Sequence, residues 1–167
     1  MSQKPLSIGQ AAPDFTLSSK TAEGPKHFTL SEAYKKQPTL LLFFPMAFTG
    51  VCTEEMCTVT SELNDYADLK ATIYGISGDN PFSQEAWALK EGIKITLLSD
   101  YGHDVATAYG VAYESFLPEI GLGMSGVPKR SAFIIDRTGI IQYAESSDNP
   151  KQLPNFEKIK ACLATLN

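Results

Sequence analysis

The sequence predicts an α/β fold in which a central mixed sheet carries helices on both faces. Segments typical of strands alternate with segments of helical spacing through the middle of the chain. A continuous apolar run at residues 39–44 is typical of a strand that is buried on both faces. Turn sequences near each end indicate antiparallel hairpins. Because the 167 residues show no internal repeat and no linker, we expect a single domain over residues 1–167.

The first elements are expected to form an N-terminal β-hairpin and a short helix. Alternating apolar and polar residues at 14–17 and 27–30 flank Gly24-Pro25, which we interpret as the turn. Ser31 is placed to cap a short helix that ends at Tyr34. The apolar strand then runs from residue 39 to residue 44 and stops before a proline.

The middle of the chain continues the alternation of helices and strands. Apolar residues recur at helical spacing from Cys52 to Leu69, which predicts one helix. Asn80 precedes a proline at the first helical position, an arrangement typical of a helix start. The elements that we expect after the first long helix are a strand at 72–77, a helix at 81–92, a strand at 94–98 and a helix at 102–109.

The C-terminal third is expected to contain a second hairpin and a final helix. Apolar segments at 131–135 and 140–144 flank an Asp-Arg-Thr-Gly turn sequence. The last helix begins near Pro154 and repeats apolar residues on one face. Residues 111–128 are rich in glycine and proline and are interpreted as a long ordered loop.

Composition and charge exclude several classes of partner. The net charge is −5 and no basic run is present, so nucleic acid is not an expected partner. No stretch reaches the apolar length of a membrane span, and the first residues lack the apolar core of a signal peptide. Three cysteines are too few for a secreted disulfide framework. We therefore expect a cytoplasmic protein that binds no membrane.

Cys52 is the strongest candidate for a reactive residue. It lies in the first turn of the predicted helix, directly after a buried strand and a short loop. Free backbone N–H groups and the positive end of the helix dipole favour an anion at this position. A cysteine here is expected to be ionised to a greater extent at neutral pH than a free cysteine, and the thiolate is the nucleophilic form.

The residues around Cys52 resemble a known family. The spacing Pro45-x-x-x-Thr49-x-x-Cys52, with Glu55 three residues later and Arg130 ahead of a predicted strand, is similar to the motif of the peroxiredoxins. The resemblance implies a thioredoxin-like fold with an N-terminal extension. It also implies reduction of peroxides by a cysteine without metal, haem or other cofactor, and recycling by a thioredoxin-like protein or another thiol reductant.

The family motif implies a role for each of these residues. Cys52 would attack the peroxide and become a sulfenic acid. The hydroxyl of Thr49 would turn toward both the thiolate and the peroxide. Arg130 would hold the thiolate deprotonated and stabilise the negative charge that develops on the departing oxygen. Glu55 would orient the guanidinium, and Pro45, which lacks an N–H, would wall one side of the pocket.

Cys57 is a candidate resolving cysteine. The spacing Cys-x4-Cys resembles the Q-type (bacterioferritin-comigratory) branch, in which the second cysteine closes an internal disulfide. In an intact helix, Cα atoms five residues apart are separated by about 8.7 Å, beyond the limit of about 7 Å for a disulfide. The first turns would therefore have to unwind during turnover. The alternative is that Cys57 is a small buried side chain.

Other features resemble the E-type branch, many of whose members have one cysteine and form dimers. The run Phe43-Phe44-Pro45-x-Ala47-Phe48-Thr49-Gly50-x-Cys52 carries this similarity. The chain is therefore expected to be a monomer or a homodimer. Cys162 falls on the apolar face of the last helix and is interpreted as a core residue. The side chains of Trp87 and Phe48 are likewise expected to serve mainly in packing.

Other functional interpretations of the thiol motif remain. A redox sensor or chaperone-like protein would need the same reactive thiolate without significant turnover. The two cysteines could begin a zinc site, but His27, His103 and Cys162 are scattered along the chain. The G-x-G-x-x-G match at 121–126 has no preceding strand and is followed by a proline, which argues against a dinucleotide site.

Overall fold

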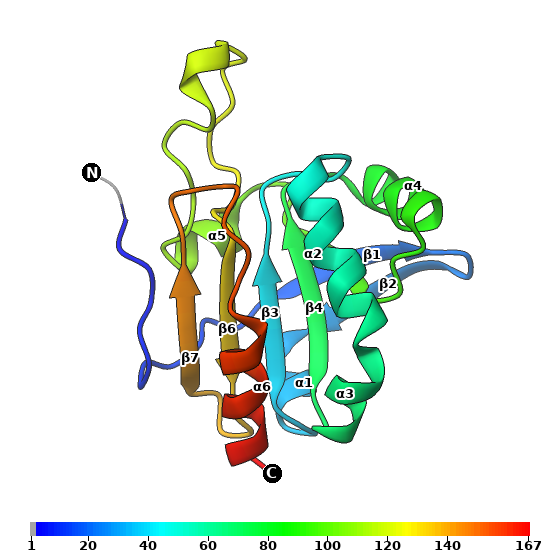
Figure 1. Ribbon diagram of the computed structural model, residues 1–167, viewed down its shortest axis with the longest axis vertical. Coiled ribbons are helices and arrows are strands. Elements are labelled where there is room, and N and C mark those ends of the chain that lie inside the picture. The colour runs from blue at the N-terminus through cyan, green and yellow to red at the C-terminus, as the bar shows by residue number, and fades with distance from the viewer. Residues whose placement is uncertain (1–2) are drawn as a thin grey trace.

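The computed structural model describes residues 3–167, and its centre is a seven-stranded mixed sheet (Figure 1). The strands lie in the order β2-β1-β5-β4-β3-β6-β7. They span Thr16–Thr21 (β1), Gly24–Thr29 (β2), Thr39–Phe43 (β3), Thr72–Ser77 (β4), Thr96–Ser99 (β5), Ser131–Ile135 (β6) and Ile141–Ser146 (β7). The predicted α/β class with a thioredoxin-like fold is thus confirmed.

Strand direction places several connections at one edge of the sheet. The central strands β3, β4 and β5 are parallel, whereas β6 runs antiparallel to β3 and β7 antiparallel to β6. The carboxyl ends of β3 and β4 therefore lie at the same edge as the amino end of β6 and the carboxyl end of β7. At the other side, the N-terminal hairpin joins the sheet through one pair of residues, Ser18 and Ser99.

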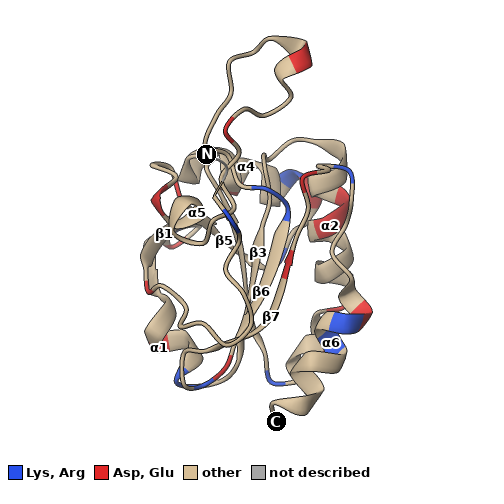
Figure 2. Ribbon diagram, turned by 90° about the vertical axis from the view of Figure 1, so that its left-hand side faces the viewer, with Lys and Arg blue, Asp and Glu red and all other residues tan. Residues whose placement is uncertain are grey.

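The helices cover both faces of the sheet and enclose two apolar clusters (Figures 1 and 2). The helices are α1 (Leu30–Tyr34), α2 (Gly50–Ser61), α3 (Leu63–Asp68), α4 (Pro81–Glu91), α5 (Asp104–Ala108) and α6 (Phe156–Thr165). Side chains of α2, α3, α4 and α6 pack on one face, and those of α1 and α5 pack on the other. Leu40 and Leu42 point to the first cluster and Leu41 and Phe43 to the second, as the alternation of a buried strand requires.

The N-terminal hairpin differs in detail from the sequence prediction. The two strands pair from Thr16 to Thr21 on one side, and the turn is formed by residues 22 and 23. Pro25 lies inside β2, which is tolerated because β2 is an edge strand and needs no ladder donor there. Ser31 is not the cap of α1: helix α1 begins one residue earlier, and the Ser31 N–H donates to the carboxylate of Asp14 at 2.9 Å.

The first long helix is also different from the prediction. It begins at Gly50, two residues before Cys52, and a break at Glu62 separates α2 from α3. The Glu62 backbone has φ −104° and ψ 13°, outside the α-helical region. By contrast, β4 and β6 have the predicted bounds, and α4 has the predicted Asn80 cap, whose side chain accepts from the Ser83 N–H at 2.9 Å.

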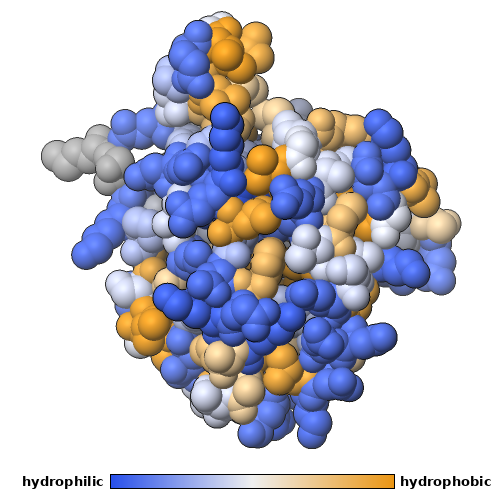
Figure 3. Space-filling model, in the orientation of Figure 1, coloured by the Kyte–Doolittle hydropathy of each residue, from blue (hydrophilic) through white to orange (hydrophobic). Residues whose placement is uncertain are grey.

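Residues 111–128 form the predicted ordered loop, and most of them make up a protruding arm. The arm, defined as residues 112–128, projects from the edge at which β3 ends (Figure 1). Bridges between Ala112 and Pro128 and between Phe116 and Met124 hold its two sides together. Its tip contains the short 3-10 helix Pro118–Ile120 and exposes the apolar side chains of Ile120 and Leu122 (Figure 3).

No helix within residues 3–167 has both the length and the apolar character needed to cross a membrane.

Candidate functional site

The site forms at the edge of the sheet where β3 ends and α2 begins. Cys52 is the third residue of α2, and its side chain is buried, with 2% of its surface exposed. Thr49 is the N-cap residue, but its side chain makes no capping hydrogen bond. The thiol thus lies in the first helical turn, where the backbone N–H groups have no partners within the helix.

Arg130 reaches the thiol from the opposite side. It directly precedes β6, and its side chain is also buried, with 2% of its surface exposed. Its Nη2 atom donates to Cys52 Sγ at 3.2 Å, and its Nη1 atom donates to Glu55 Oε2 at 2.5 Å. Cys52 and Glu55 lie on one side of α2 within a single turn, so one guanidinium can contact both. The structure therefore brings together three of the predicted site residues.

A backbone carbonyl completes the surroundings of the guanidinium. Arg130 Nε and Nη2 donate to the carbonyl oxygen of Pro150 at 3.1 and 2.8 Å. Pro150 lies in the loop that follows β7, at the same edge of the sheet. Its role could not be predicted from the sequence, because a carbonyl oxygen is present in every residue and leaves no signal in the residue type.

Glu55 is the acidic partner of Arg130 and is completely buried. Burial raises the pKa of its carboxyl to about 7, although the positive charge and hydrogen bond of Arg130 act in the opposite direction. Glu145 adds a smaller effect that also raises this pKa. The second carboxyl oxygen, Oε1, has no hydrogen-bond partner in the described part of the chain. Both the protonated and the ionised form of Glu55 are therefore accessible near neutral pH.

Thr49 does not hydrogen-bond to the thiol. Its hydroxyl donates to the carbonyl oxygen of Met46 at 2.7 Å, and its side chain is exposed at the entrance to α2. The proton of the hydroxyl is thus engaged, while the lone pairs of the oxygen remain able to accept a hydrogen bond. Pro45 is buried in the loop between β3 and α2.

Asp79 anchors the same loop and was missed by the sequence analysis. Its Oδ2 atom accepts from the Ala47 N–H at 2.8 Å and from the Ser77 hydroxyl at 2.7 Å. It lies two residues after the end of β4, so the carboxyl end of one parallel strand fixes the loop at the end of its neighbour. A carboxylate two residues after the end of a buried parallel strand was the signal that could have found it.

The two aromatic residues near the site differ in environment. Trp87 is completely buried, and its ring centroid lies 5.3 Å from that of Phe44. Its Nε1 atom donates to Thr53 Oγ1 at 3.1 Å. The expectation that Phe48 serves in packing is wrong, since 53% of its surface is exposed and its φ is 61°. The Nζ atom of Lys90 lies over the Phe48 ring, 5.9 Å from the ring centroid. The tight turn into α2 places this side chain outside the core.

The three cysteines are free thiols with different surroundings. Cys57 is half-buried on α2, and its thiol donates to the carbonyl oxygen of Glu91 at the end of α4, at 3.7 Å. Cys162 packs against the apolar cluster, as predicted, and burial raises its pKa. Because α2 is continuous from Gly50 to Ser61, Cys52 and Cys57 cannot pair without local unwinding.

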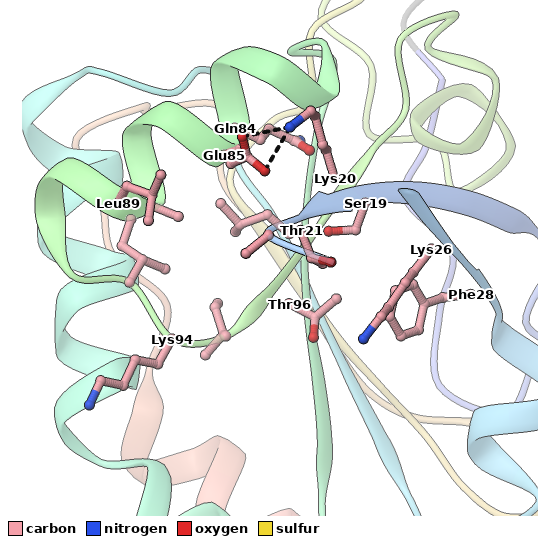
Figure 4. Close-up of a pocket in the computed structure, with 15 residues that line it drawn as sticks. Ser19, Lys20, Thr21, Lys26, Phe28, Gln84, Glu85, Leu89, Lys94 and Thr96 are labelled. Atoms are coloured by element: carbon pink, nitrogen blue, oxygen red, sulfur yellow. Dashed lines mark hydrogen bonds and ion pairs between the residues drawn. The ribbon is translucent and has the colours of Figure 1, made fainter. Parts of the chain in front are cut away.

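Neither a metal site nor the cleft beside the N-terminal hairpin contributes to this arrangement. Among residues 3–167, no three histidine, cysteine, aspartate or glutamate side chains could together hold a metal ion. A cleft of about 330 Å³ lies between the N-terminal hairpin, α4 and β5 (Figure 4). It is crossed by the ion pair of Lys20 and Glu85, and none of the predicted site residues lines it.

The chain is similar to known proteins in sequence and in structure. The AhpC/TSA family matches residues 8–144. The chain is 34% identical to alkyl hydroperoxide reductase E of Mycobacterium tuberculosis over 84% of this chain and 85% of that protein. It is also 34% identical to chloroplastic peroxiredoxin Q of Triticum aestivum, over 83% of this chain and 58% of that protein. The structure is similar to peroxidoxin BcpB of Mycobacterium tuberculosis, with a TM-score of 0.80, 28% identity, and coverage of 96% and 97% of the two chains.

Replacing Glu55 by glutamine tests the effect of burial on its ionisation. The pKa of this carboxyl is about 7 in the folded protein and 4.5 in an unperturbed glutamate, so the folded state holds the proton more tightly. The resulting stabilisation is complete below about pH 4.5 and is lost as the pH rises through about 7. In a Cys52→Ser background, we expect the free energy of unfolding to fall by on the order of 3 kcal/mol more between pH 4.5 and pH 8 than it does when Glu55 is also replaced by glutamine. Urea unfolding between pH 4.5 and pH 8 measures this difference, and parallel pH dependences would contradict it.

Proposed function

The chain belongs to the AhpC/TSA family and is a peroxiredoxin-type thiol peroxidase, and we propose that it reduces hydrogen peroxide and organic hydroperoxides through Cys52. The observation that carries this proposal is the hydrogen bond of 3.2 Å from the buried guanidinium of Arg130 to Cys52 Sγ. A guanidinium at this distance favours the thiolate over the neutral thiol, because the anion gains a charge-assisted hydrogen bond.

The proposed reaction is a displacement on oxygen. The sulfur of Cys52 attacks one peroxide oxygen, an S–O bond forms as the O–O bond breaks, and the thiolate is oxidised to a sulfenic acid. The departing oxygen takes up a proton and leaves as water or an alcohol. Arg130 has the geometry to stabilise the charge that moves from sulfur to this oxygen, since its Nη2 atom already lies against the sulfur.

The remaining site residues are proposed to position the reactants. Glu55 and the Pro150 carbonyl hold the plane of the guanidinium. The Thr49 oxygen, which donates its own proton to Met46, would accept a hydrogen bond from the peroxide O–H and so orient it. Pro45 offers no N–H to the pocket, which limits the water that can be held beside the sulfur.

We further propose that Cys57 resolves the sulfenic acid. Its thiol would attack the sulfur of oxidised Cys52, release water and form a disulfide, which a thioredoxin-like protein would reduce. This step requires the first turns of α2 to unwind and the contact of Cys57 with the Glu91 carbonyl to break. The Cys-x4-Cys spacing supports this route over reduction by an external thiol. The chain has the same 34% identity to an E-type and a Q-type relative, so resemblance alone favours neither route.

Replacing Cys52 by serine tests the assignment of the reactive residue. We expect Cys52→Ser to abolish peroxide consumption, because the mechanism requires the sulfur atom. Cys162→Ser is the matched control, since that thiol packs against the core, and it should keep the wild-type rate. Steady-state consumption with dithiothreitol as reductant measures the effect. Many equivalents consumed by wild type exclude a sensor that stops after one, and near-native activity of Cys52→Ser would contradict the proposal.

Replacing Arg130 by methionine tests the source of the thiolate's reactivity. We expect the rate of Cys52 oxidation to fall by about 100-fold or more, because the charge that stabilises both the thiolate and the departing oxygen is removed. Alkylation of Cys52 by iodoacetamide should require a higher pH. Arg137→Met is the control, because Arg137 is exposed in the turn between β6 and β7. An unchanged alkylation profile in Arg130→Met would show that the helix terminus alone activates the thiol.

Replacing Cys57 by serine tests the resolving step. After one equivalent of peroxide, the intact mass of wild type should fall by two hydrogens, whereas Cys57→Ser should gain one oxygen. With excess peroxide the variant should gain a second oxygen, because its sulfenic acid is not trapped. Cys162→Ser should behave like wild type. If Cys57→Ser turns over normally with a thioredoxin-type donor, the protein is a one-cysteine enzyme that is reduced from outside.

A further inference from the structure

The loop after β7, here called the carbonyl loop and defined as residues 147–152, is built to present one backbone oxygen. Pro150 supplies that oxygen, which accepts two hydrogen bonds from Arg130. Within the loop, Ser147 Oγ accepts from the Asn149 N–H at 3.1 Å. The Ser147 N–H in turn donates to the Arg130 carbonyl at 3.1 Å. The backbone and the side chain of Arg130 are therefore both tied to this loop.

The carbonyl loop is itself held by the base of the arm. The hydroxyl of Tyr113 donates to the backbone carbonyl of Asp148 at 2.9 Å. Lys129 pairs with the Asp148 carboxylate at 2.6 Å and lies over the Tyr113 ring at 5.8 Å. Tyr113 is fixed in turn by backbone hydrogen bonds of 2.9 and 2.8 Å with Val127 and Gly126 on the other side of the arm.

We propose that Tyr113 is a positioning residue for Arg130, acting through the carbonyl loop. The Tyr113 hydroxyl hydrogen-bonds to the carbonyl of Asp148, and two peptide units connect Asp148 to Pro150. The Pro150 carbonyl in turn accepts from the guanidinium that contacts Cys52. The inference rests on the proposed role of Cys52 and extends it. The arm, which contributes no side chain to the Cys52–Arg130–Glu55 contacts, thereby influences the site.

The Tyr113 hydroxyl is the decisive contact because of the kind of bond it makes. The ion pair of Lys129 with Asp148 holds only a side chain, whose carboxylate is 86% exposed, and leaves the backbone of the loop without a direct contact. Tyr113 instead binds the backbone two residues before Pro150. Removing a neutral hydroxyl leaves every charge around Cys52 in place. Any change in the reactivity of Cys52 would then come from the position of Arg130.

The experiment compares two tyrosine-to-phenylalanine variants. Tyr113→Phe removes the hydrogen bond to Asp148, and Tyr109→Phe removes an equivalent hydrogen bond of 2.9 Å to the Pro13 carbonyl in the opposite face of the molecule. We expect Tyr113→Phe to slow single-turnover oxidation of Cys52 by about 3- to 10-fold, the effect of one hydrogen bond of about 1 kcal/mol. Tyr109→Phe should oxidise at the wild-type rate. Thermal unfolding verifies that both variants are folded.

A double-mutant cycle separates positioning from a general structural effect. If Tyr113 acts through Arg130, Tyr113→Phe should cause no further loss in an Arg130→Met background. The same cycle is measured by the pH dependence of Cys52 alkylation with iodoacetamide, which does not require peroxide. Unchanged oxidation and alkylation in Tyr113→Phe, or an equal loss in both backgrounds, would overturn the inference. Failure of wild type to consume peroxide would overturn the proposed function, while the alkylation cycle would still test the positioning.

Discussion

The burial of one guanidinium is the constraint on which the site depends. Arg130 has only 2% of its surface exposed, so its N–H groups cannot be left to water and need partners within the protein. The carboxylate of Glu55, the sulfur of Cys52 and the carbonyl of Pro150 supply them. These groups come from α2 and from the loop after β7. The ends of α2, β6 and β7 must therefore converge at one edge of the sheet, as Figure 1 shows.

Charge balance gives Glu55 a second significance. In a buried site of low dielectric constant, one guanidinium balances the charge of one anion. This site contains two groups that can become anions, a carboxyl and a thiol. Burial raises the pKa of Glu55 to about 7, which makes its neutral form accessible near neutral pH. When Glu55 is neutral, the positive charge of Arg130 is available to the thiolate. The Oε1 atom of Glu55 accepts no hydrogen bond in the described part of the chain, so no donor at this atom stabilises the carboxylate form.

The surrounding scaffold fixes these groups through hydrogen bonds to the loops and the helix that carry them. Asp79 holds the loop before α2, the α4 residue Trp87 contacts Thr53 in the first turns of α2, and Tyr113 holds the loop that carries Pro150. The first two contacts would be strained or broken if α2 unwound to bring Cys57 to Cys52. The same contacts that order the reduced site therefore oppose the proposed disulfide, and the energy of disulfide formation would have to exceed them.

Neighbouring residues in the sequence were enough to predict the sheet and to identify the candidate site residues. Buried strands such as β3 and β6 are mainly apolar runs, and the Asn80 cap of α4 is a local hydrogen bond, so both were predictable from neighbouring residues. The motif also identified Cys52, Glu55 and Arg130, which the structure brings into contact although they lie up to 78 residues apart. The sequence did not reveal the roles of Asp79 and Pro150, the exposure of Phe48 or the hydrogen bond of Thr49 to Met46. Those features depend on which backbone groups meet across the fold, and backbone groups are the same in every residue.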